Sequence, residues 1–413
     1  MASTVGPVQL AGDFKNLYQN SGLVTALPTW AIVQDKWKFE EAESLGQYYI
    51  FGVVLQKEHG ATYAPSSGSN SGPQTLNASI AGYVAQVQVE GYSIYMRSRL
   101  SYDAAAKASR AGKKAFAQAY GAVLKNLKES HQYRLELSMI YGQQGLGKVD
   151  SNTSGALVLY AAYWATGIWA AGLANCILEA WTDQTDSATQ HNGDLTISSV
   201  DVSAKKVTVT GTNSSVVQND WLYFKGAKTS SAFNECPGLS AILNNSGTLF
   251  NVNAATYDAW QSQSYDVAGN LSMSAILQGA SLGMSYGLEE GTLLVAPEKF
   301  AQLGLDEAAL RRYVNDKDQH STSRGVKGVE FMLGPVSIEV MAHPFVWQGY
   351  PMLVPSKHVH RVGATDITFG MPGSDEPMEV HVTDTTALEI RSMSDQGIYI
   401  ERPAHAVQFT GVT

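Results

Sequence analysis

The sequence predicts an α+β fold organised around one long helix. A run without proline, rich in Ala and Lys, extends from Asp103 to Tyr141. Segments with β-type composition precede this run, and short β-type segments dominate the last third of the chain. The chain has 413 residues, of which 44% are hydrophobic and 16% charged, so it can form two or three domains with a large core.

Residues 1–44 are predicted to form an extended arm. They begin with small and polar residues and contain few apolar anchors, among them Trp30 and Trp37. This is too little apolar surface for the segment to fold alone, so it must lie on its own body or on a neighbouring molecule. Trp30 and Trp37 are therefore candidate inter-subunit contacts.

Residues 45–100 are predicted to form a long two-stranded finger. Tyr48–Leu55 has the β-branched and aromatic content of a strand, and Ala85–Tyr95 alternates with period two. Between them, Tyr63–Pro73 is a Gly-, Ser- and Pro-rich tip. Because an isolated hairpin is marginally stable in water, a finger of this length implies a partner surface. Its candidate contact residues are Lys57, His59 and Tyr63.

The central run is predicted to be a single helix of about 57 Å at 1.5 Å per residue. Asp103 is a suitable N-cap, and Phe116, Val123 and Leu127 belong to an apolar series with three- and four-residue spacing. Gly142, directly after the last apolar residue, is the expected end of the helix.

Positive charge is concentrated in this region. Between Arg97 and Glu136 nine basic residues stand against three acidic ones, whereas the whole chain has a net charge of −9. Lys107, Arg110, Lys113 and Lys114 are the candidate residues for a face that contacts DNA or an acidic partner. A solvated helix face explains the same pattern, and the sequence leaves both readings open.

The segment Gly142–Val149 resembles a phosphate-binding loop of the form G-x-x-x-x-G-K-[S/T]. Val149 stands where the magnesium-binding hydroxyl belongs, and the segment follows a helix instead of opening one. We therefore expect a glycine-rich helix end that leads into a strand. A nucleotide-binding enzyme that uses a degenerate loop at 142–148 is the alternative.

Other candidates for chemistry are weak. His358 and His360 lie on one side of a predicted strand but lack a third metal ligand at fixed spacing, so we expect surface histidines. Cys176 and Cys236 are the only cysteines, and no signal-like apolar run follows Met1, so we expect reduced thiols in a cytosolic setting. Residues 151–178 carry no charge but place their aromatic residues centrally, which indicates a buried segment instead of a membrane span. No catalytic, cofactor or metal site is predicted.

After this segment, a small inserted β unit is expected at about 190–228, with strands marked by Leu195–Ile197, Val207–Val209 and Asn219–Phe224. Helices are predicted at Leu271–Gly287 and Gln302–Tyr313, with a buried strand at Leu293–Pro297 between them. The remaining predicted strands are Val329–Met332, Val336–Met341, Glu379–Val382, Ala387–Met393 and Ile398–Ile400.

The order of these parts resembles the major capsid proteins of tailed bacteriophages, which share the Hong Kong 97-type capsid fold. Several sequence segments are similar to members of that family with a β insertion: Tyr141–Gly147, Ala165–Ala170, Leu195–Phe224, Ala296–Phe300, Gly363–Phe369 and Arg402–Ala404. The resemblance spans nearly the whole chain.

The resemblance implies a division into named parts. Residues 1–44 would be the N-terminal arm and 45–100 the extended β loop that lies over an adjacent subunit. Residues 101–150 would form the peripheral domain with its spine helix, and 151–375 the axial domain with the β insertion. Residues 376–413 would return to the peripheral domain.

The resemblance also implies a function. The chain would be a non-enzymatic coat protein that assembles as hexamers and pentamers into an icosahedral shell around double-stranded DNA, which it would contact without sequence specificity. Portal, scaffold and decoration proteins are expected partners, and a membrane is not. The expected location is the virion capsid, and the host cytoplasm during assembly. Some family members cross-link a Lys to an Asn; Lys57 lies in the finger, but no matching Asn is identified.

Overall fold

The structure is a computed structural model, and it describes residues 31–41, 48–63, 75–101, 113–170, 172–191, 193–304, 329–370, 379–381 and 387–413. The helices in this part of the chain are α2 (Ile32–Lys36), α4 (Lys113–Tyr141), α5 (Thr166–Trp169), α6 (Leu239–Leu243), α7 (Met273–Ser285) and α8 (Pro297–Leu303). Short 3₁₀ helices are η1 (Ala161–Tyr163), η2 (Asp258–Trp260) and η3 (Pro403–His405).

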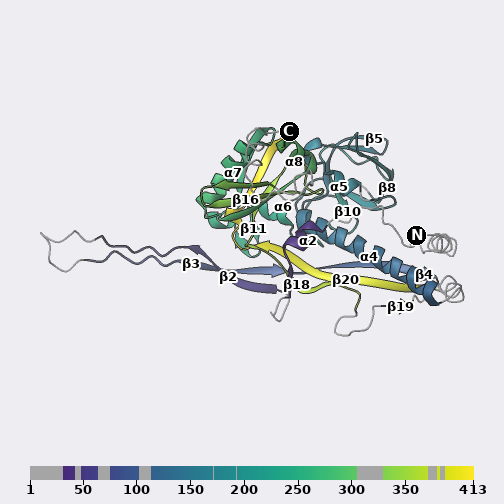
Figure 1. The fold of residues 1–413 in the computed structure, drawn as a ribbon, viewed down its shortest axis with the longest axis horizontal. Helices are drawn as coiled ribbons and strands as arrows, with labels where there is room; N and C mark the ends of the chain where they lie inside the picture. Colours follow the sequence, from purple (N-terminus) through teal and green to yellow (C-terminus); the bar gives the residue numbers. More distant parts are fainter. Residues whose placement is uncertain are drawn as a thin grey trace, which may run out of the picture.

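An elongated sheet lies against the long helix α4 (Figure 1). Its centre is β20 (Ala387–Ile400), which pairs along one edge with β4 (Tyr92–Ser101). The other edge of β20 pairs with β18 (Val359–Thr368) and β19 (Glu379–His381). β1 (Phe39–Glu41) is added in parallel beside β18. The sequence-predicted strands 387–393 and 398–400 are thus one strand.

The hairpin β2 (Tyr48–Gln56) and β3 (Tyr83–Glu90) extends far from the body, as predicted (Figure 1). The second predicted strand, 85–95, is corrected: it breaks at Gly91, and the chain passes there from β3 into β4 of the elongated sheet. Gly91 lies close to the Asp395 carboxylate, and a side chain at position 91 would require that carboxylate to move. Period-two alternation continues through the break, so the sequence pattern could not locate it.

The predicted inserted unit at 190–228 is half of a larger structure. A six-stranded closed barrel contains β5 (Gly147–Thr153), β6 (Ala156–Leu159), β7 (Ile177–Trp181), β8 (Leu195–Asp201), β9 (Lys206–Gly211) and β10 (Trp221–Phe224). β10 closes it by pairing with both β5 and β7. The apolar side chains of the predicted strands therefore need partners from 147–181 to form a core. The uncharged segment 151–178 contains the end of β5, all of β6 and the start of β7, with η1 and α5 between the strands. No helix among the described residues is long and apolar enough to cross a bilayer.

A six-stranded sheet in the order β13-β21-β17-β14-β16-β15 forms the rest of the body. Its strands are β13 (Gln263–Gly269), β14 (Glu290–Val295), β15 (Val329–Leu333), β16 (Val336–Ala342), β17 (Met352–Pro355) and β21 (Val407–Val412), and a small ribbon joins β11 (Thr248–Leu249) to β12 (Val252–Asn253). The helix α7, predicted at 271–287, packs on this sheet and is capped by the Ser272 side chain. A helix begins at Pro297, where proline suits the first helical position, and it ends at Leu303, so it overlaps only the first two residues of the helix predicted at 302–313. Residues beyond 304 lie outside the described part.

The chain passes between the two sheets several times. After β17 it enters the elongated sheet with β18, which lies within the segment 151–375. After β20 it returns with β21, which lies within the segment 376–413 and pairs with β13 and β17. The division into peripheral and axial domains stays a prediction.

Candidate assembly surfaces

The root of the hairpin is attached to the body by one face. Tyr49 and Phe51 point inward together with Val87 and Val89, which lie opposite them in register. Phe51 packs against the ring of Tyr399 at a centroid distance of 4.9 Å. The backbone N–H of Gln88 donates to Phe250 O at 3.1 Å, which adds a polar anchor at the edge of β3.

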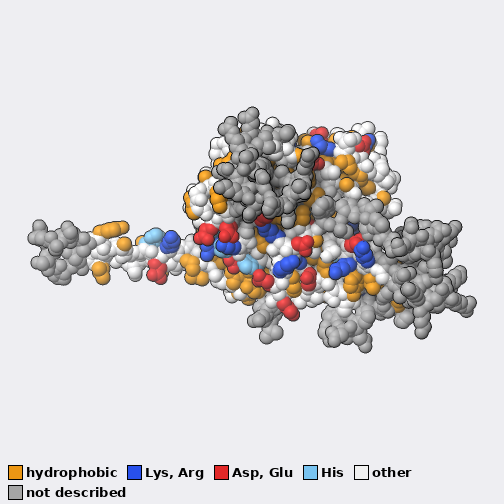
Figure 2. Space-filling view, viewed as in Figure 1, with side chains coloured by type: hydrophobic (Ala, Val, Ile, Leu, Met, Phe, Trp, Pro, Cys, Tyr) orange, Lys and Arg blue, Asp and Glu red, His pale blue; other side chains and the backbone are white. Residues whose placement is uncertain are grey.

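The opposite face of the hairpin is exposed, and β2 contributes mainly apolar side chains to it, whereas β3 contributes Val84 beside Gln86, Gln88 and Glu90. It carries Tyr48, Ile50 and Val54 from β2 and Val84 from β3, and the side chains of Val54 and Val84 are 66% and 62% exposed. Val54 and Val84 are direct register partners, so they form one continuous patch. Apolar side chains are visible along the projecting hairpin in Figure 2. We call Tyr48, Ile50, Val54 and Val84 the outer hairpin face.

The distal hairpin holds three of the predicted contact residues. Lys57, His59 and Tyr63 are all exposed, and Tyr63 is 92% exposed. The two chain segments are joined here by a bridge between His59 and Ile80, with the His59 N–H donating to Ile80 O at 2.9 Å, and by the Asn77 side chain, which donates to Ala61 O at 2.8 Å. This part of the hairpin projects beyond the body, so these side chains are accessible to another molecule.

The described part of the arm is fixed to its own subunit. The helix α2 has Ala31 at its N-cap and no local side-chain cap. Glu136 of α4 takes that role from far away: its carboxylate accepts the backbone N–H of Val33 at 2.6 Å and of Gln34 at 3.2 Å. His343 Nδ1 accepts the backbone N–H of Phe345, so the proton of the neutral ring is on Nε2. Nε2 donates it to the same carboxylate at 3.0 Å. All three groups are buried, so the otherwise unpaired N–H groups of the helix start are satisfied.

The other end of α2 is held by a buried cation. Arg361 donates from Nη1 to Gln34 O at 2.9 Å and to Trp37 O at 3.0 Å, and from Nη2 to Gln396 at 2.6 Å. A five-residue helix is thus clamped between Glu136 and Arg361. The predicted role of Trp37 is corrected accordingly: its side chain is buried in its own subunit and its indole donates to Ser356 O at 3.0 Å. Trp30 lies outside the described residues.

The predicted basic face is described only in part. Lys113 and Lys114 are the first residues of α4, whereas Lys107 and Arg110 lie outside the described residues. The C-terminal half of the helix is buried, with Leu135, Met139 and Ile140 in the main core. The C-terminal half of α4 therefore offers no extended charged surface, and the role of Lys113 and Lys114 stays a prediction.

The segment 142–149 does not form a phosphate cradle. It follows α4 and runs directly into β5, as the sequence indicated. A Cβ at Gly142 would collide with the carbonyls of Cys236 and Ser138, so its backbone is closely covered by protein. The ammonium of Lys148 lies over the rings of Tyr160, Tyr163 and Trp221 at 5.5 to 5.8 Å.

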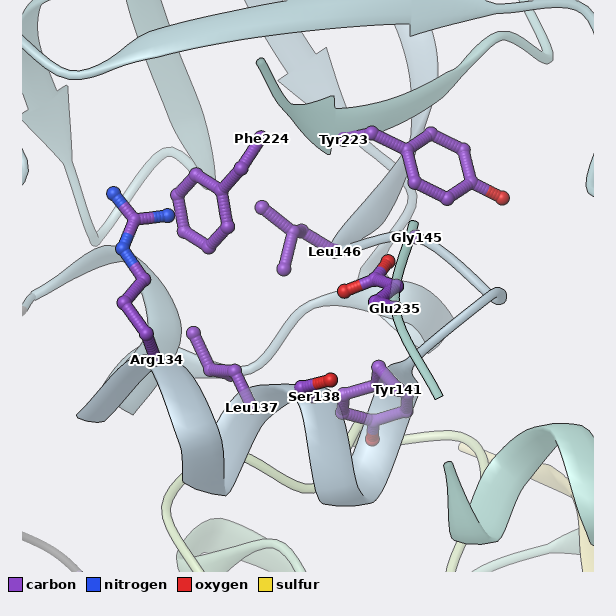
Figure 3. A pocket seen from close by; sticks show the side chains of 9 residues that line it. All are labelled: Arg134, Leu137, Ser138, Tyr141, Gly145, Leu146, Tyr223, Phe224 and Glu235. Carbon is purple, nitrogen blue, oxygen red and sulfur yellow. The ribbon is translucent and has the colours of Figure 1, made fainter. Parts of the chain in front are cut away.

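A small cavity of about 20 Å³ lies where α4 meets the barrel (Figure 3). Arg134 stacks on Phe224 on one side, and the Glu235 carboxylate faces the cavity from the other. Burial raises the pKa of Glu235 to about 7, although the Gln143 N–H and the charge of Arg134 act in the opposite direction. The volume suits about one water molecule and is far below that of a ligand pocket.

His358 and His360 share a carboxylate instead of a metal ion. His358 Nδ1 lies 2.9 Å and His360 Nε2 lies 3.4 Å from the oxygens of Glu401. They are partly buried, which corrects the expectation of surface side chains. Among the described residues no group of three or more His, Cys, Asp or Glu side chains could hold a metal ion.

A solved capsid structure has the same arrangement of parts. A chain of the cyanophage A-1(L) capsid asymmetric unit matches with a TM-score of 0.52 at 10% identity, over 95% of this chain and 96% of that chain. This chain has the fold of a phage capsid protein. The α+β capsid fold predicted from the order of parts is confirmed.

Two further matches have lower scores. The capsid chain of the native GTA particle gives a TM-score of 0.48 at 6% identity, covering 95% of this chain and 94% of that one. A chain from Mycobacterium phage Bobi gives 0.47 at 11% identity, covering 99% of both chains. No protein-family model and no curated protein sequence matches the chain.

The two residues that hold α2 could not be recognised in the sequence. Glu136 stands there as one of the few acidic residues of a basic helix, and Arg361 directly follows His360. One signal was present: Glu136 lies in the apolar half of α4, where a carboxylate needs buried donors. The sequence does not reveal that those donors are 102 to 207 positions away.

Proposed function

We propose that this chain is a major capsid protein that assembles into an icosahedral shell around a double-stranded DNA genome. The outer hairpin face carries this proposal. It is apolar and exposed on an element that extends beyond the body, and such a face is stabilised when another surface covers it. Copies of the same chain in a closed shell supply that surface. The capsid fold supports the same function.

In this proposal the hairpin is the extended loop that lies over a neighbouring subunit. Lys57, His59 and Tyr63 contact that neighbour, and residues 1–30 of the arm, with Trp30, do the same. Hexamers and pentamers are the assembly units. The role is structural, without a catalytic step, in the virion capsid and, before that, in the host cytoplasm.

The N-terminal part of α4, with Lys107, Arg110, Lys113 and Lys114, is proposed to face the DNA or an acidic partner. Contact with DNA would be through phosphates and would not depend on sequence. Portal, scaffold and decoration proteins are proposed as further partners.

Expression of the chain followed by negative-stain microscopy and light scattering tests the function. Hexamers, sheets or shells are the expected result. A compact monomer at every concentration would contradict the proposal. A nucleotide-binding titration of the same material should give no saturable signal, and a saturable one would favour the enzyme reading of residues 142–148.

A further inference from the structure

The elongated sheet carries three arginines around one carboxylate on the face opposite α4. The two faces are distinguished by β20: Ser392 and Ser394 turn toward the helix, where their hydroxyls bond to the two ring nitrogens of His131 at 2.8 Å. Side chains alternate along a strand, so Glu389 and Arg391 point away from the helix. Their partners on β4 point the same way, with Arg99 opposite Glu389 and Arg97 opposite Arg391. We call Arg97, Arg99 and Arg391 with Glu389 the arginine patch.

The carboxylate fixes the guanidinium groups. Arg99 Nε donates to Glu389 Oε2 at 2.8 Å and Arg391 Nε donates to Oε1 at 2.7 Å. Arg97 Nη1 lies 3.8 Å from Oε2. Burial acts to raise the pKa of Glu389, but the arginine contacts outweigh it and the pKa lies below its ordinary value. The carboxylate is therefore ionised at neutral pH, and both of its oxygens are occupied.

Positive charge remains in excess. Three guanidinium groups face one carboxylate, and the side chains of Arg97 and Arg391 are 60% and 42% exposed. These two like charges lie directly opposite each other across the strands, an arrangement that destabilises a sheet. Within the described residues, the Nη groups of Arg391 have no hydrogen-bond acceptor, because its contact with Glu389 is made through Nε. A planar guanidinium with its terminal nitrogens accessible suits a carboxylate in a bidentate geometry.

We propose that the arginine patch binds side-chain carboxylates of a second copy of this chain, as a contact between subunits of the shell. This inference rests on the proposed function. A second carboxylate offsets the positive charge that the single carboxylate of Glu389 leaves uncompensated on Arg97 and Arg391. The chain as a whole has a net charge of −9, so a second copy offers an acidic surface to this positive patch.

The surroundings of the patch favour protein over nucleic acid. On the same face as the arginine patch, the next register pair is Tyr95 with Met393, and the one after it is Ser93 with Asp395. The face thus becomes apolar and then acidic within two pairs, and the Asp395 carboxylate would repel a phosphate backbone. DNA binding draws on several phosphate contacts in succession, and this face offers one discrete anion position.

Zero-length carbodiimide coupling on assembled particles identifies the partner. The Arg97→Lys chain introduces an amine at the patch, and coupling joins it to a carboxylate in direct contact. Particles assembled from equal amounts of ¹⁴N and ¹⁵N chains show by mass spectrometry whether the linked peptides come from different copies. We expect mixed-isotope cross-links at position 97 and covalent dimers on a denaturing gel. Both should be absent for the same site in Arg97→Gln particles.

The energetic test uses Arg97→Gln combined with Arg391→Gln. We expect the concentration needed for assembly to rise about tenfold, which corresponds to roughly 1.4 kcal/mol. The melting temperature of the unassembled chain should be unchanged or higher, since the like-charge pair is removed. Lys125→Gln is the matched control, an exposed basic residue on α4 that pairs with Glu129, and it should leave assembly unchanged.

Three results would overturn the inference. Cross-links that join position 97 only to Asp375, Glu376 or another carboxylate of the same copy would make the patch an internal contact. A loss of assembly that appears only when DNA is present would assign the patch to nucleic acid. Normal assembly of the double variant, without mixed-isotope links, would show that the patch takes no part. If the unmodified chain did not assemble at all, the proposed function would be refuted, and the proposed contact between subunits at the arginine patch would be refuted with it.

Discussion

The arm segment 31–41 and the hairpin were both expected to depend on neighbouring molecules, and the structure separates them. The arm segment is held inside its own subunit, with Glu136 at one end of α2 and Arg361 at the other. The hairpin is held by one face only, and its outer face is open. The arm segment is the shorter of the two and offers less apolar surface, yet it is the more completely buried.

The difference shows that apolar area alone does not decide where a segment lies. A short helix leaves N–H and C=O groups unpaired at its ends, and burying them without partners costs about as much as a lost hydrogen bond each. Buried charges at both ends of α2 remove that cost. In the hairpin, strand pairing supplies hydrogen-bond partners for the backbone N–H and C=O groups. The apolar side chains of the outer hairpin face can therefore be covered by a second molecule without leaving backbone groups unpaired.

Glu136→Ala tests the arm side of this comparison and should have the largest effect. It removes the acceptor of the Val33 and Gln34 N–H groups and of His343, all of them buried. We expect a loss of about 3 to 5 kcal/mol in the free energy of unfolding, measured by denaturant titration. Limited proteolysis should also cut within residues 31–41. Asp194→Ala, at the exposed pair with Lys225, is the control and should cost less than about 1 kcal/mol.

If Glu136→Ala left both the free energy of unfolding and the proteolysis pattern unchanged, α2 would be held by its apolar contacts alone. The difference between the arm segment and the hairpin would then depend only on how much apolar surface each one buries.

Phe51→Ala tests the attached face of the hairpin. Phe51 packs on Tyr399 and is half-buried, so the expected cost is about 2 kcal/mol, below the 3 to 5 kcal/mol typical of a fully buried Phe. Denaturant titration of the unassembled chain measures it. An unchanged free energy of unfolding would mean that the hairpin root is not part of the cooperative fold.

Glu235→Gln sharpens the comparison by changing a partly buried carboxylate that accepts one long hydrogen bond, from the Gln143 N–H at 3.4 Å, where Glu136 accepts several. The folded-state pKa of Glu235 is raised to about 7 by burial, so its stabilising effect is present at low pH and is lost as the pH rises through 7. The unmodified chain should lose about 1 to 2 kcal/mol between pH 5 and pH 8 relative to the variant. Melting temperatures across this range give the difference, and parallel pH profiles would contradict the assignment.

Ile50→Ser should have the smallest effect on folding, below about 0.5 kcal/mol, because the outer hairpin face is exposed. Assembly should nevertheless be lost or strongly weakened. Gln88→Ser, at the register partner on the same face, removes no apolar area and should assemble normally. Equal assembly by both variants would show that the outer hairpin face is not an inter-subunit contact.

Local sequence patterns predicted the elements that local forces determine. The end of α4 at Gly142, the strand 48–55 and the helix near 271–287 follow from composition, spacing and capping. The order of parts was sufficient to predict the capsid fold. The candidate contacts Lys57, His59 and Tyr63 are accessible on the hairpin, and their role stays a prediction.

The features that failed depend on distant partners. After Gly91 the chain pairs with β20, almost 300 positions away in the sequence, and the barrel is closed by strands from 147–181 that carry little β signal. The clamp on α2 joins positions separated by 103 residues for Glu136 and 327 for Arg361. Trp37 could be recognised as an anchor from its size and apolar character, but the sequence did not show that its site was in the same chain.

The crossing at Gly91 also has a mechanical consequence. Because β3 continues into β4 with a single residue between them, tension on the hairpin passes directly into the ten register pairs that β4 makes with β20. Hydrogen bonds of an antiparallel ladder lie across the strands, so tension along β4 loads them together instead of one after another. A shell built in this way would spread internal pressure through every subunit along that ladder.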